Sequence, residues 1–296
     1  MYIVRGKKMH VEIFGEKSSP AVLFLHGGPG ESCYEFVYHQ ADRLSEHVQL
    51  IAIDQRGVCR SEMVQPKEDF RLDDLIEDFE ALRLQLNIDH WSVIGHSFGG
   101  YLALIYASRY PKSVSRLVFE CPTFNFGWTS RSLLKKASSV FLSVGDVQNS
   151  NECMKLSEAL LTNKELFEHY IRLGEALGEK KSVIYNPTPM SWTDYSSYSD
   201  EEWDEYGSRT EIHLERLQKE GSMFESIVPL LPDISVPSML ILGEHDPVTC
   251  PRHIQAYNQT DGESIIFEGC GHTPHAEQPD RYRDVIISFL LPGINP

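Results

Sequence analysis

The sequence predicts an α/β protein with a mostly parallel, doubly wound sheet and an inserted helical cap. Two observations predict this class. Short apolar runs alternate with stretches of helical periodicity in residues 1–122 and again in 234–296. Between them, residues 123–233 show helical patterns and loops without a buried strand. This segment is too long for a loop, so we expect a core of 1–122 and 234–296 carrying a cap of 123–233.

The strands and helices of the core are expected in a regular order. Residues 9–14 alternate weakly, which predicts an antiparallel strand, and continuous apolar runs predict strands buried on both faces. Helical spacing behind Asp73 and Asp74 predicts a helix, since acidic residues favour a helix N-terminus. The expected strands are 9–14, 21–25, 50–53, 91–94, 116–120, 238–242 and 264–267, and the expected core helices are 73–86, 98–109 and 281–290.

Composition excludes several classes of protein. The chain has 296 residues, of which 41% are hydrophobic and 24% charged, as in ordinary globular proteins. A net charge of −16 disfavours binding to nucleic acid or to anionic lipid. Apolar runs are too short to cross a bilayer, no secretory signal is visible, and the six cysteines lack zinc-binding spacing. We therefore expect a cytoplasmic protein with reduced thiols, no membrane or nucleic-acid partner, no metal and no cofactor.

The segment Gly95-His96-Ser97-Phe98-Gly99 matches G-x-S-x-G between an expected strand and an expected helix. That context is the one a nucleophile elbow requires, because the sharp turn exposes the serine hydroxyl above the sheet. Ser97 is therefore the predicted nucleophile. The alternative interpretation is a tight turn with an exposed serine.

A serine needs a base, and an acid that orients the base, to become nucleophilic. In this arrangement the acid and then the histidine follow the serine, each in a loop after a strand. Asp246 follows the strand expected at 238–242, and His272 follows the one at 264–267. We predict a Ser97, Asp246 and His272 triad; Glu244 is a less suitable acid because it would point away if Asp246 points inward.

The segment His26-Gly27-Gly28-Pro29-Gly30 follows the expected strand 21–25. Glycines let the backbone approach a substrate oxygen closely, and two N–H groups aimed at one point stabilise an oxyanion. We expect the N–H groups of Gly28 and Phe98 to form this oxyanion hole, with His26 supporting the loop.

These motifs, with Asp54-Gln-Arg-Gly57 and Arg60-Ser61, resemble the proline iminopeptidase (prolyl aminopeptidase) family of α/β-hydrolases. The resemblance spans both core segments. It implies the α/β-hydrolase fold and an enzyme that removes N-terminal residues, often proline, from short peptides. It also implies that glutamates of the helical cap bind the free α-amine of the substrate.

The chain departs from the family pattern in places. Phe98 stands where the family usually has tryptophan, Cys59 where a second glycine is expected, and Pro247 where some members have a glutamate. The cap also lacks an NGPxEF-like stretch. The prediction of a hydrolase does not depend on these positions, whereas the proline preference does.

An acidic stretch lies in the expected cap, with ten acidic and three basic residues between Asp194 and Glu225. An acidic surface attracts cationic substrates. Glu211 and Glu215 are candidates for binding an amine, because their i and i+4 spacing puts them on one helix face; a solvated surface is the alternative. Aromatic residues of this region are expected to form cap core or to line a pocket, namely Trp192, Tyr195, Tyr198, Trp203 and Tyr206.

The sequence thus predicts a serine exopeptidase that acts through an acyl-enzyme on a small molecule or short peptide with a free amine. The alternatives are a hydrolase of a carboxylester, lactone or carbon–carbon bond, and a non-catalytic binding protein on the same fold. An epoxide or haloalkane hydrolase would need an acidic residue in place of Ser97. The sequence does not indicate an oligomeric state.

Overall fold

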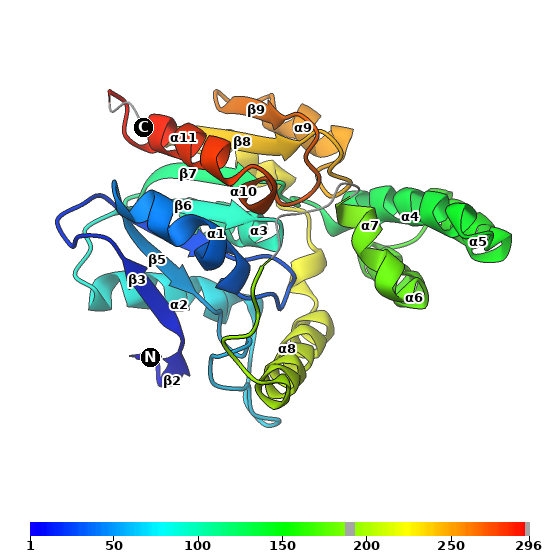
Figure 1. The fold of residues 1–296 in the computed structure, drawn as a ribbon, viewed down its shortest axis with the longest axis horizontal. Helices are drawn as coiled ribbons and strands as arrows, with labels where there is room; N and C mark the ends of the chain where they lie inside the picture. The colour runs from blue at the N-terminus through cyan, green and yellow to red at the C-terminus, as the bar shows by residue number, and fades with distance from the viewer. Residues whose placement is uncertain (187–192, 294–296) are drawn as a thin grey trace.

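A seven-stranded sheet forms the centre of the computed structural model, which describes residues 1–186 and 193–293 (Figure 1). The strand order is β3-β5-β4-β6-β7-β8-β9, with β3 antiparallel to β5 and the other neighbours parallel. The predicted α/β class with a mostly parallel sheet is confirmed. The strands are β3 (Val11–Phe14), β4 (Ala21–Leu25), β5 (Gln49–Ile53), β6 (Trp91–His96), β7 (Val114–Glu120), β8 (Ser238–Gly243) and β9 (Glu263–Phe267).

The antiparallel strand expected over 9–14 is confirmed over Val11–Phe14, but Met9 belongs to a different strand. Strands β1 (Tyr2–Val4) and β2 (Lys7–Met9) form a separate antiparallel pair, and only β3 joins the large sheet. The chain changes its pairing partner at His10. Because Met9 and Val11 are both buried, the apolar pattern continues through this change and hides it.

Helices cover both faces of the sheet (Figure 1). Val22 and Phe24 of β4 share a buried cluster with α1 and α11, whereas Leu23 and Leu25 share another with α2 and α3. Successive side chains of a strand point to opposite faces, so one apolar run serves both clusters. The core helices are α1 (Tyr34–Ser45), α2 (Leu72–Gln85), α3 (Phe98–Arg109), α9 (Pro251–Tyr257), α10 (Pro274–Glu277) and α11 (Pro279–Leu290).

Helix α1 is absent from the sequence-based prediction. Its buried face includes His39 and Gln40 beside Phe36 and Leu44. Polar residues at buried positions interrupt the apolar periodicity by which helices are recognised. Gln40 is accommodated because it donates a hydrogen bond of 2.7 Å to the carbonyl oxygen of His275.

The register of the sheet brings distant loops to one edge. Leu25 pairs with Gly95, His96 with Glu120, and Gly243 with Phe267, each near the carboxyl end of its strand. The loops after β4, β6, β8 and β9 therefore begin side by side. In sheets of this kind, ligands bind outside the carboxyl ends of the strands.

Residues 123–186 and 193–233 contain helices and loops but no strand, and the helices form two groups (Figure 1). Helices α4, α5, α6 and α7 share a buried cluster that also includes Val248 of the core. Leu217 of α8 belongs to a cluster of the main core, as do Phe126 of α4 and Phe167 of α6. That 123–233 is a separate domain stays a prediction. The elements are α4 (Phe126–Ser143), α5 (Val147–Glu158), α6 (Asn163–Ala176), η1 (Gly178–Lys181), α7 (Ser182–Tyr185), α8 (Asp200–Glu220), η2 (Ser222–Phe224) and η3 (Val228–Asp233).

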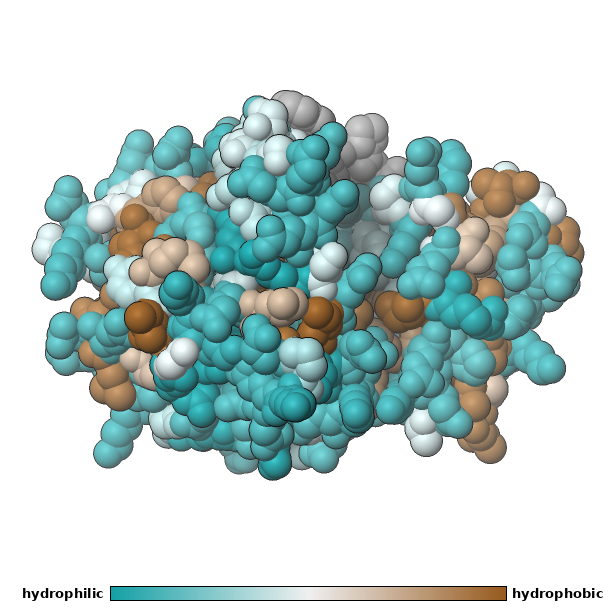
Figure 2. Space-filling model, turned by 90° about the horizontal axis from the view of Figure 1, so that it is seen from below, coloured by the Kyte–Doolittle hydropathy of each residue, from teal (hydrophilic) through white to brown (hydrophobic). Residues whose placement is uncertain are grey.

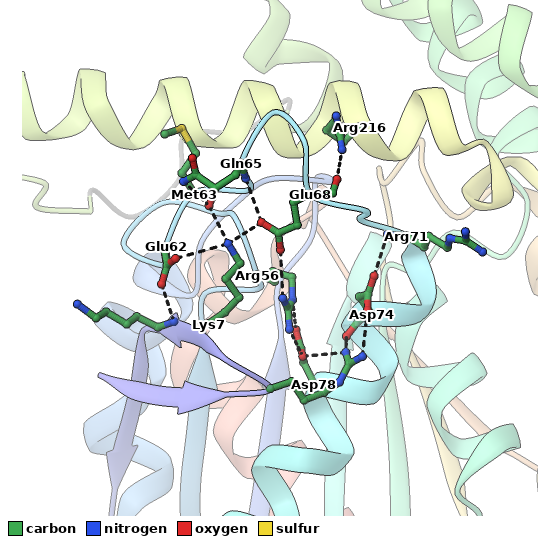
Figure 3. Close-up of polar contacts among 12 residues, drawn as sticks. Lys7, Arg56, Glu62, Met63, Gln65, Glu68, Arg71, Asp74, Asp78 and Arg216 are labelled. Carbon is green, nitrogen blue, oxygen red and sulfur yellow. Dashed lines mark hydrogen bonds and ion pairs between the residues drawn. The ribbon is translucent and has the colours of Figure 1, made fainter.

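Polar contacts fasten α8 to the loop between β5 and α2 (Figure 3). Nδ1 of the buried His213 lies 2.7 Å from the carbonyl oxygen of Arg56, and Arg216 donates to the carbonyl oxygen of Glu68. The guanidinium of Arg56 in turn makes two hydrogen bonds of 2.6 Å to Asp78 of α2. Helix α8 is therefore connected through this loop to the core.

Polar residues cover most of the face shown in Figure 2, and brown apolar patches are scattered over it, including at the end that carries α4–α6. Exposed apolar side chains of that region include Leu142, Val144, Val147 and Leu160. None of the helices in the described ranges is long and apolar enough to span a bilayer. The six cysteines are free and buried.

Candidate active site

Ser97 lies on a strained turn between β6 and α3. Its φ of 54° and ψ of −116° fall in a region that non-glycine residues rarely adopt. A Cβ atom on Gly95 would lie 2.4 Å from the carbonyl oxygen of Gly99, and one on Gly99 would lie 2.0 Å from that of Leu25. Only glycine fits at these two positions, so the tight turn accounts for the G-x-S-x-G spacing.

His272 and Asp246 form a buried hydrogen-bonded pair. Nδ1 of His272 lies 2.8 Å from Oδ1 of Asp246, and the aspartate side chain is 1% exposed. The carboxylate also accepts hydrogen bonds of 2.9 Å from the backbone N–H groups of Val248 and Thr249. These contacts fix both side chains in one orientation.

The charges of this pair stabilise each other. Burial by itself would raise the pKa of Asp246, but His272 and the two N–H donors outweigh it and lower that pKa. Burial by itself would lower the pKa of His272, but Asp246 outweighs it and raises that pKa above 6.5. His272 is therefore a stronger base than an ordinary histidine.

Ser97, His272 and Gly28 line one cavity of about 500 Å³. Phe98 begins α3, and the first N–H groups of a helix lack partners within it. Gly28 and Phe98 thus approach the nucleophile from the loop after β4 and from the start of α3. Their assignment as the oxyanion hole stays a prediction.

The helices of the insertion contribute an apolar wall to this cavity. Phe126 and Leu133 of α4, Phe167 and Ile171 of α6 and Leu214 of α8 line it. The wall gives neutral parts of a substrate a surface to bury. It offers no carboxylate from these helices within the described residues.

Glu211 and Glu215 are not among the residues that line the cavity, and their role in binding an amine stays a prediction. Both are exposed on α8, whereas Thr210 and Leu214 line the cavity. The spacing does place the two glutamates on one helix face, but that face points to solvent.

The expected aromatic residues of the insertion form a cluster around Tyr34 of α1. Tyr195 stacks on Tyr34 with ring centroids 5.4 Å apart, and Trp203 meets Tyr34 edge-on at the same distance. Tyr198 and Tyr206 pack against Trp203. Trp192 lies outside the described residues. The cluster joins the insertion to α1.

Two carboxylates that the sequence analysis overlooked line the cavity in place of the expected pair. Glu31 directly follows the His26–Gly30 motif, and Glu35 follows it by four residues at the start of α1. Their spacing beside an oxyanion-loop motif was the available signal. Both belong to the core, and both line the same cavity as Ser97.

Residues of the Asp54–Arg60 motif hold the loop after β4. Asp54 accepts a hydrogen bond of 2.9 Å from the backbone N–H of Cys33 and one of 2.7 Å from Nε of Arg60. Nε2 of His26 accepts from the backbone N–H of Gln55 at 3.0 Å. The loop that carries Gly28 and Glu31 is therefore anchored at both ends, with His26 as a support.

Among the residues that the structure describes, two groups have the spacing of metal ligands, but their chemistry fits ion pairs. His96, Glu120 and His275 form one of them. Burial opposes a charge on His275, yet Glu120 at 2.9 Å outweighs it and raises the pKa of His275 to about 10. A protonated imidazole has no lone pair for a metal. The other group, Cys121, Asp246 and His272, contains the pair described above.

Comparisons with known proteins identify the family. Residues 20–279 match the family described as the alpha/beta hydrolase fold, and the chain belongs to it. A proline iminopeptidase of Heyndrickxia coagulans is 28% identical, covering 97% of this chain and 96% of the relative. Epoxide hydrolase 3 of Xenopus tropicalis is 26% identical, covering 96% of this chain and 75% of the relative.

A solved structure shares the fold over nearly its full length. It is a proline iminopeptidase-related protein from Thermus thermophilus, with a TM-score of 0.70 and 22% identity, covering 98% of this chain and 97% of that one. The predicted α/β-hydrolase fold is confirmed, as is the resemblance to proline iminopeptidases. The chain is accordingly a member of a hydrolase family.

Proposed function

We propose that the chain is a serine hydrolase that releases N-terminal residues, proline preferred, from short peptides through an acyl-enzyme on Ser97. The observation that carries this proposal is the His272–Asp246 pair at the cavity that Ser97 lines. The similarity to a proline iminopeptidase over nearly the whole chain supports the choice of an exopeptidase.

In the proposed reaction, Nε2 of His272 removes the proton of Ser97 as its oxygen attacks the substrate carbonyl. Asp246 keeps the other proton on Nδ1 and stabilises the imidazolium. The N–H groups of Gly28 and Phe98 stabilise the negative oxygen of the tetrahedral intermediate, a contribution of about 3 kcal/mol per donor. His272 then protonates the leaving amine, and water hydrolyses the acyl-enzyme by the reverse sequence.

The cavity sets the size of the proposed substrate. Its volume of about 500 Å³ lies within the range of roughly 300–1,000 Å³ typical of small-molecule sites. This space suits a short peptide or another small molecule. A free amine on the substrate would find its partners among the carboxylates that line the cavity, Glu31 and Glu35.

Hydrolysis of a carboxylester, a lactone or a carbon–carbon bond is the second candidate. The apolar wall formed by α4, α6 and α8 favours it, because a neutral acyl group would be buried there without any charged partner. The same triad would serve this chemistry. Epoxide opening by an acidic nucleophile does not fit, since Ser97 occupies the elbow.

A substrate panel tests the proposal. The purified protein is assayed with proline and alanine 4-nitroanilides, their N-acetylated counterparts, 4-nitrophenyl acetate and a simple lactone. We expect the free-amine anilides to be cleaved with the highest kcat/KM. Equal cleavage of free and acetylated anilides, or hydrolysis of the ester and lactone alone, would overturn the exopeptidase assignment in favour of the second candidate.

Ser97→Ala is the matched control for this panel. The variant should fold like the wild type and lose all but a small fraction of activity on every substrate. A fluorophosphonate should label the wild type at Ser97 and leave the variant unlabelled. Substantial activity in Ser97→Ala would refute the nucleophile, whichever substrate is preferred.

A further inference from the structure

A second cavity, of about 230 Å³, adjoins the first and shares Glu31, Glu35 and Thr273 with it. We propose that this smaller cavity is the subsite for the cationic α-amine of the substrate, with the carboxylates of Glu31 and Glu35 as its partners. The inference rests on the proposed function, because it assigns the amine of a peptide N-terminus. It places amine recognition in the core of the fold and not in the inserted helices.

Glu31 lies directly beside the nucleophile. A Cβ atom on Gly27 would lie 2.7 Å from Oε2 of Glu31 and 2.9 Å from Cβ of Ser97. The glycine therefore leaves the space in which the carboxylate and the serine approach each other. The α-amine of a peptide is one carbon away from the carbonyl that Ser97 would attack, so its partner must lie this close to the serine.

Glu35 supplies the second carboxylate, four residues further along the chain in the first turn of α1. One of its oxygens lies 3.6 Å from Nε2 of His275, and the other accepts a hydrogen bond of 3.3 Å from the hydroxyl of Tyr195. Burial opposes its charge, but His275 outweighs burial and lowers the pKa of Glu35. Glu35 is therefore ionised at neutral pH and is held in place from two sides.

The charges around the smaller cavity do not balance. Glu31, Glu35 and the adjacent buried Glu120 are acidic, while the protonated His275 is one compensating cation. His26 is neutral at pH 7, since burial lowers its pKa to about 4. The described lining contains neither lysine nor arginine. An excess of negative charge around a cavity favours a cationic ligand.

The surroundings also affect the charge of Glu31 itself. Glu31 is an exposed residue, yet the protein atoms packed around its carboxylate raise its pKa, and Glu35 adds to this effect. His272 and His275 act in the opposite direction. An ammonium group between the two glutamates would relieve both the desolvation of Glu31 and the repulsion between the carboxylates.

Another polar group in this cavity lacks a hydrogen-bond partner. This observation is independent of the two acids. His96 is 4% exposed and lines the smaller cavity, and its Nδ1 has no hydrogen-bond partner among the described residues. Oε2 of Glu120 lies 3.6 Å from this nitrogen, beyond hydrogen-bonding distance. An unpaired buried polar atom is costly and indicates a missing ligand or water. Burial lowers the pKa of His96 to about 3, so its ring is neutral and adds no compensating positive charge to the cavity.

A binding experiment tests the subsite without relying on turnover. Ser97→Ala protein is titrated with prolinamide and with N-acetylprolinamide, followed by ligand-observed NMR at neutral pH. We expect prolinamide to bind about 30-fold more tightly than its acetylated form, because burying a charge against a charged partner contributes a factor of this order. Adding Glu31→Gln should reduce that ratio by about tenfold or more, and Glu31→Asp should restore part of it.

The matched control is Glu211→Gln, which removes an exposed glutamate of α8 and should leave the ratio unchanged. Circular dichroism checks the fold of each variant; if Glu31→Gln does not fold, Glu35→Gln provides the test. Equal affinities for the two ligands in Ser97→Ala protein, or a ratio that Glu31→Gln does not change, would overturn the subsite.

The proposed exopeptidase function is tested separately from the subsite, and it is refuted if the wild type cleaves no free-amine anilide. An amine-dependent affinity lost in Glu31→Gln would then still establish the subsite. The opposite result combines two observations. The wild type cleaves free-amine anilides, and Glu31→Gln leaves the affinity ratio of prolinamide to N-acetylprolinamide unchanged. The function would stand, and the amine would bind elsewhere.

Discussion

At the scale of single residues, His272 determines how activity depends on pH. Burial opposes its charge, but Asp246 raises its pKa above 6.5, and only the neutral ring accepts the proton of Ser97. We expect kcat/KM for a neutral ester to fall as pH falls through this raised pKa. Asp246→Asn should lower kcat on the order of 10⁴-fold and shift the acid limb of the residual activity to lower pH. A pH–rate profile of both proteins measures this, and an acid limb at the same pH in both would contradict the pairing.

At the scale of elements, α8 depends on its contacts with the loop between β5 and α2. His213 is fully buried and contacts the carbonyl oxygen of Arg56 at 2.7 Å. His213→Ala should destabilise the protein by about 1–3 kcal/mol, because it leaves that oxygen unpaired and opens a cavity. It should also raise KM, since α8 carries Leu214 to the cavity. Urea unfolding measures the change; the exposed control Glu215→Ala should shift stability by less than about 0.5 kcal/mol, and equal effects would contradict this role.

At the scale of the whole molecule, a buried ion pair joins distant segments. Glu120 ends β7, and His275 follows β9 and also approaches Glu35 of α1. The pKa of His275 is raised to about 10 from an ordinary 6.5, so the folded state keeps a proton that the unfolded state loses. The resulting stability is complete below pH 6.5 and is lost as pH rises through about 10. We expect the difference in unfolding free energy between the wild type and His275→Gln to shrink over this interval; a constant difference in urea titrations would refute the ion pair.

Several features of the fold were predictable because local chemistry dictates them. The apolar run of β4 and the helical run of α3 have the predicted bounds, since a strand or helix buried in the core needs continuous apolar side chains. The turn at Ser97 was predictable because glycine is required at Gly95 and Gly99 by close backbone contacts. Helix α1 was not, because its buried His39 and Gln40 are paired by residues distant in the sequence.

By itself, the sequence determined the class of the protein, the parallel core and the positions of a serine, an acid and a histidine along the chain. It did not distinguish between two glutamate pairs, Glu31 with Glu35 and Glu211 with Glu215, which have the same spacing of four residues. Only the tertiary structure decided that the first pair lines the cavity and that the second faces solvent. The physical reason is that spacing places two side chains on one face, whereas the packing of the rest of the chain decides what that face meets.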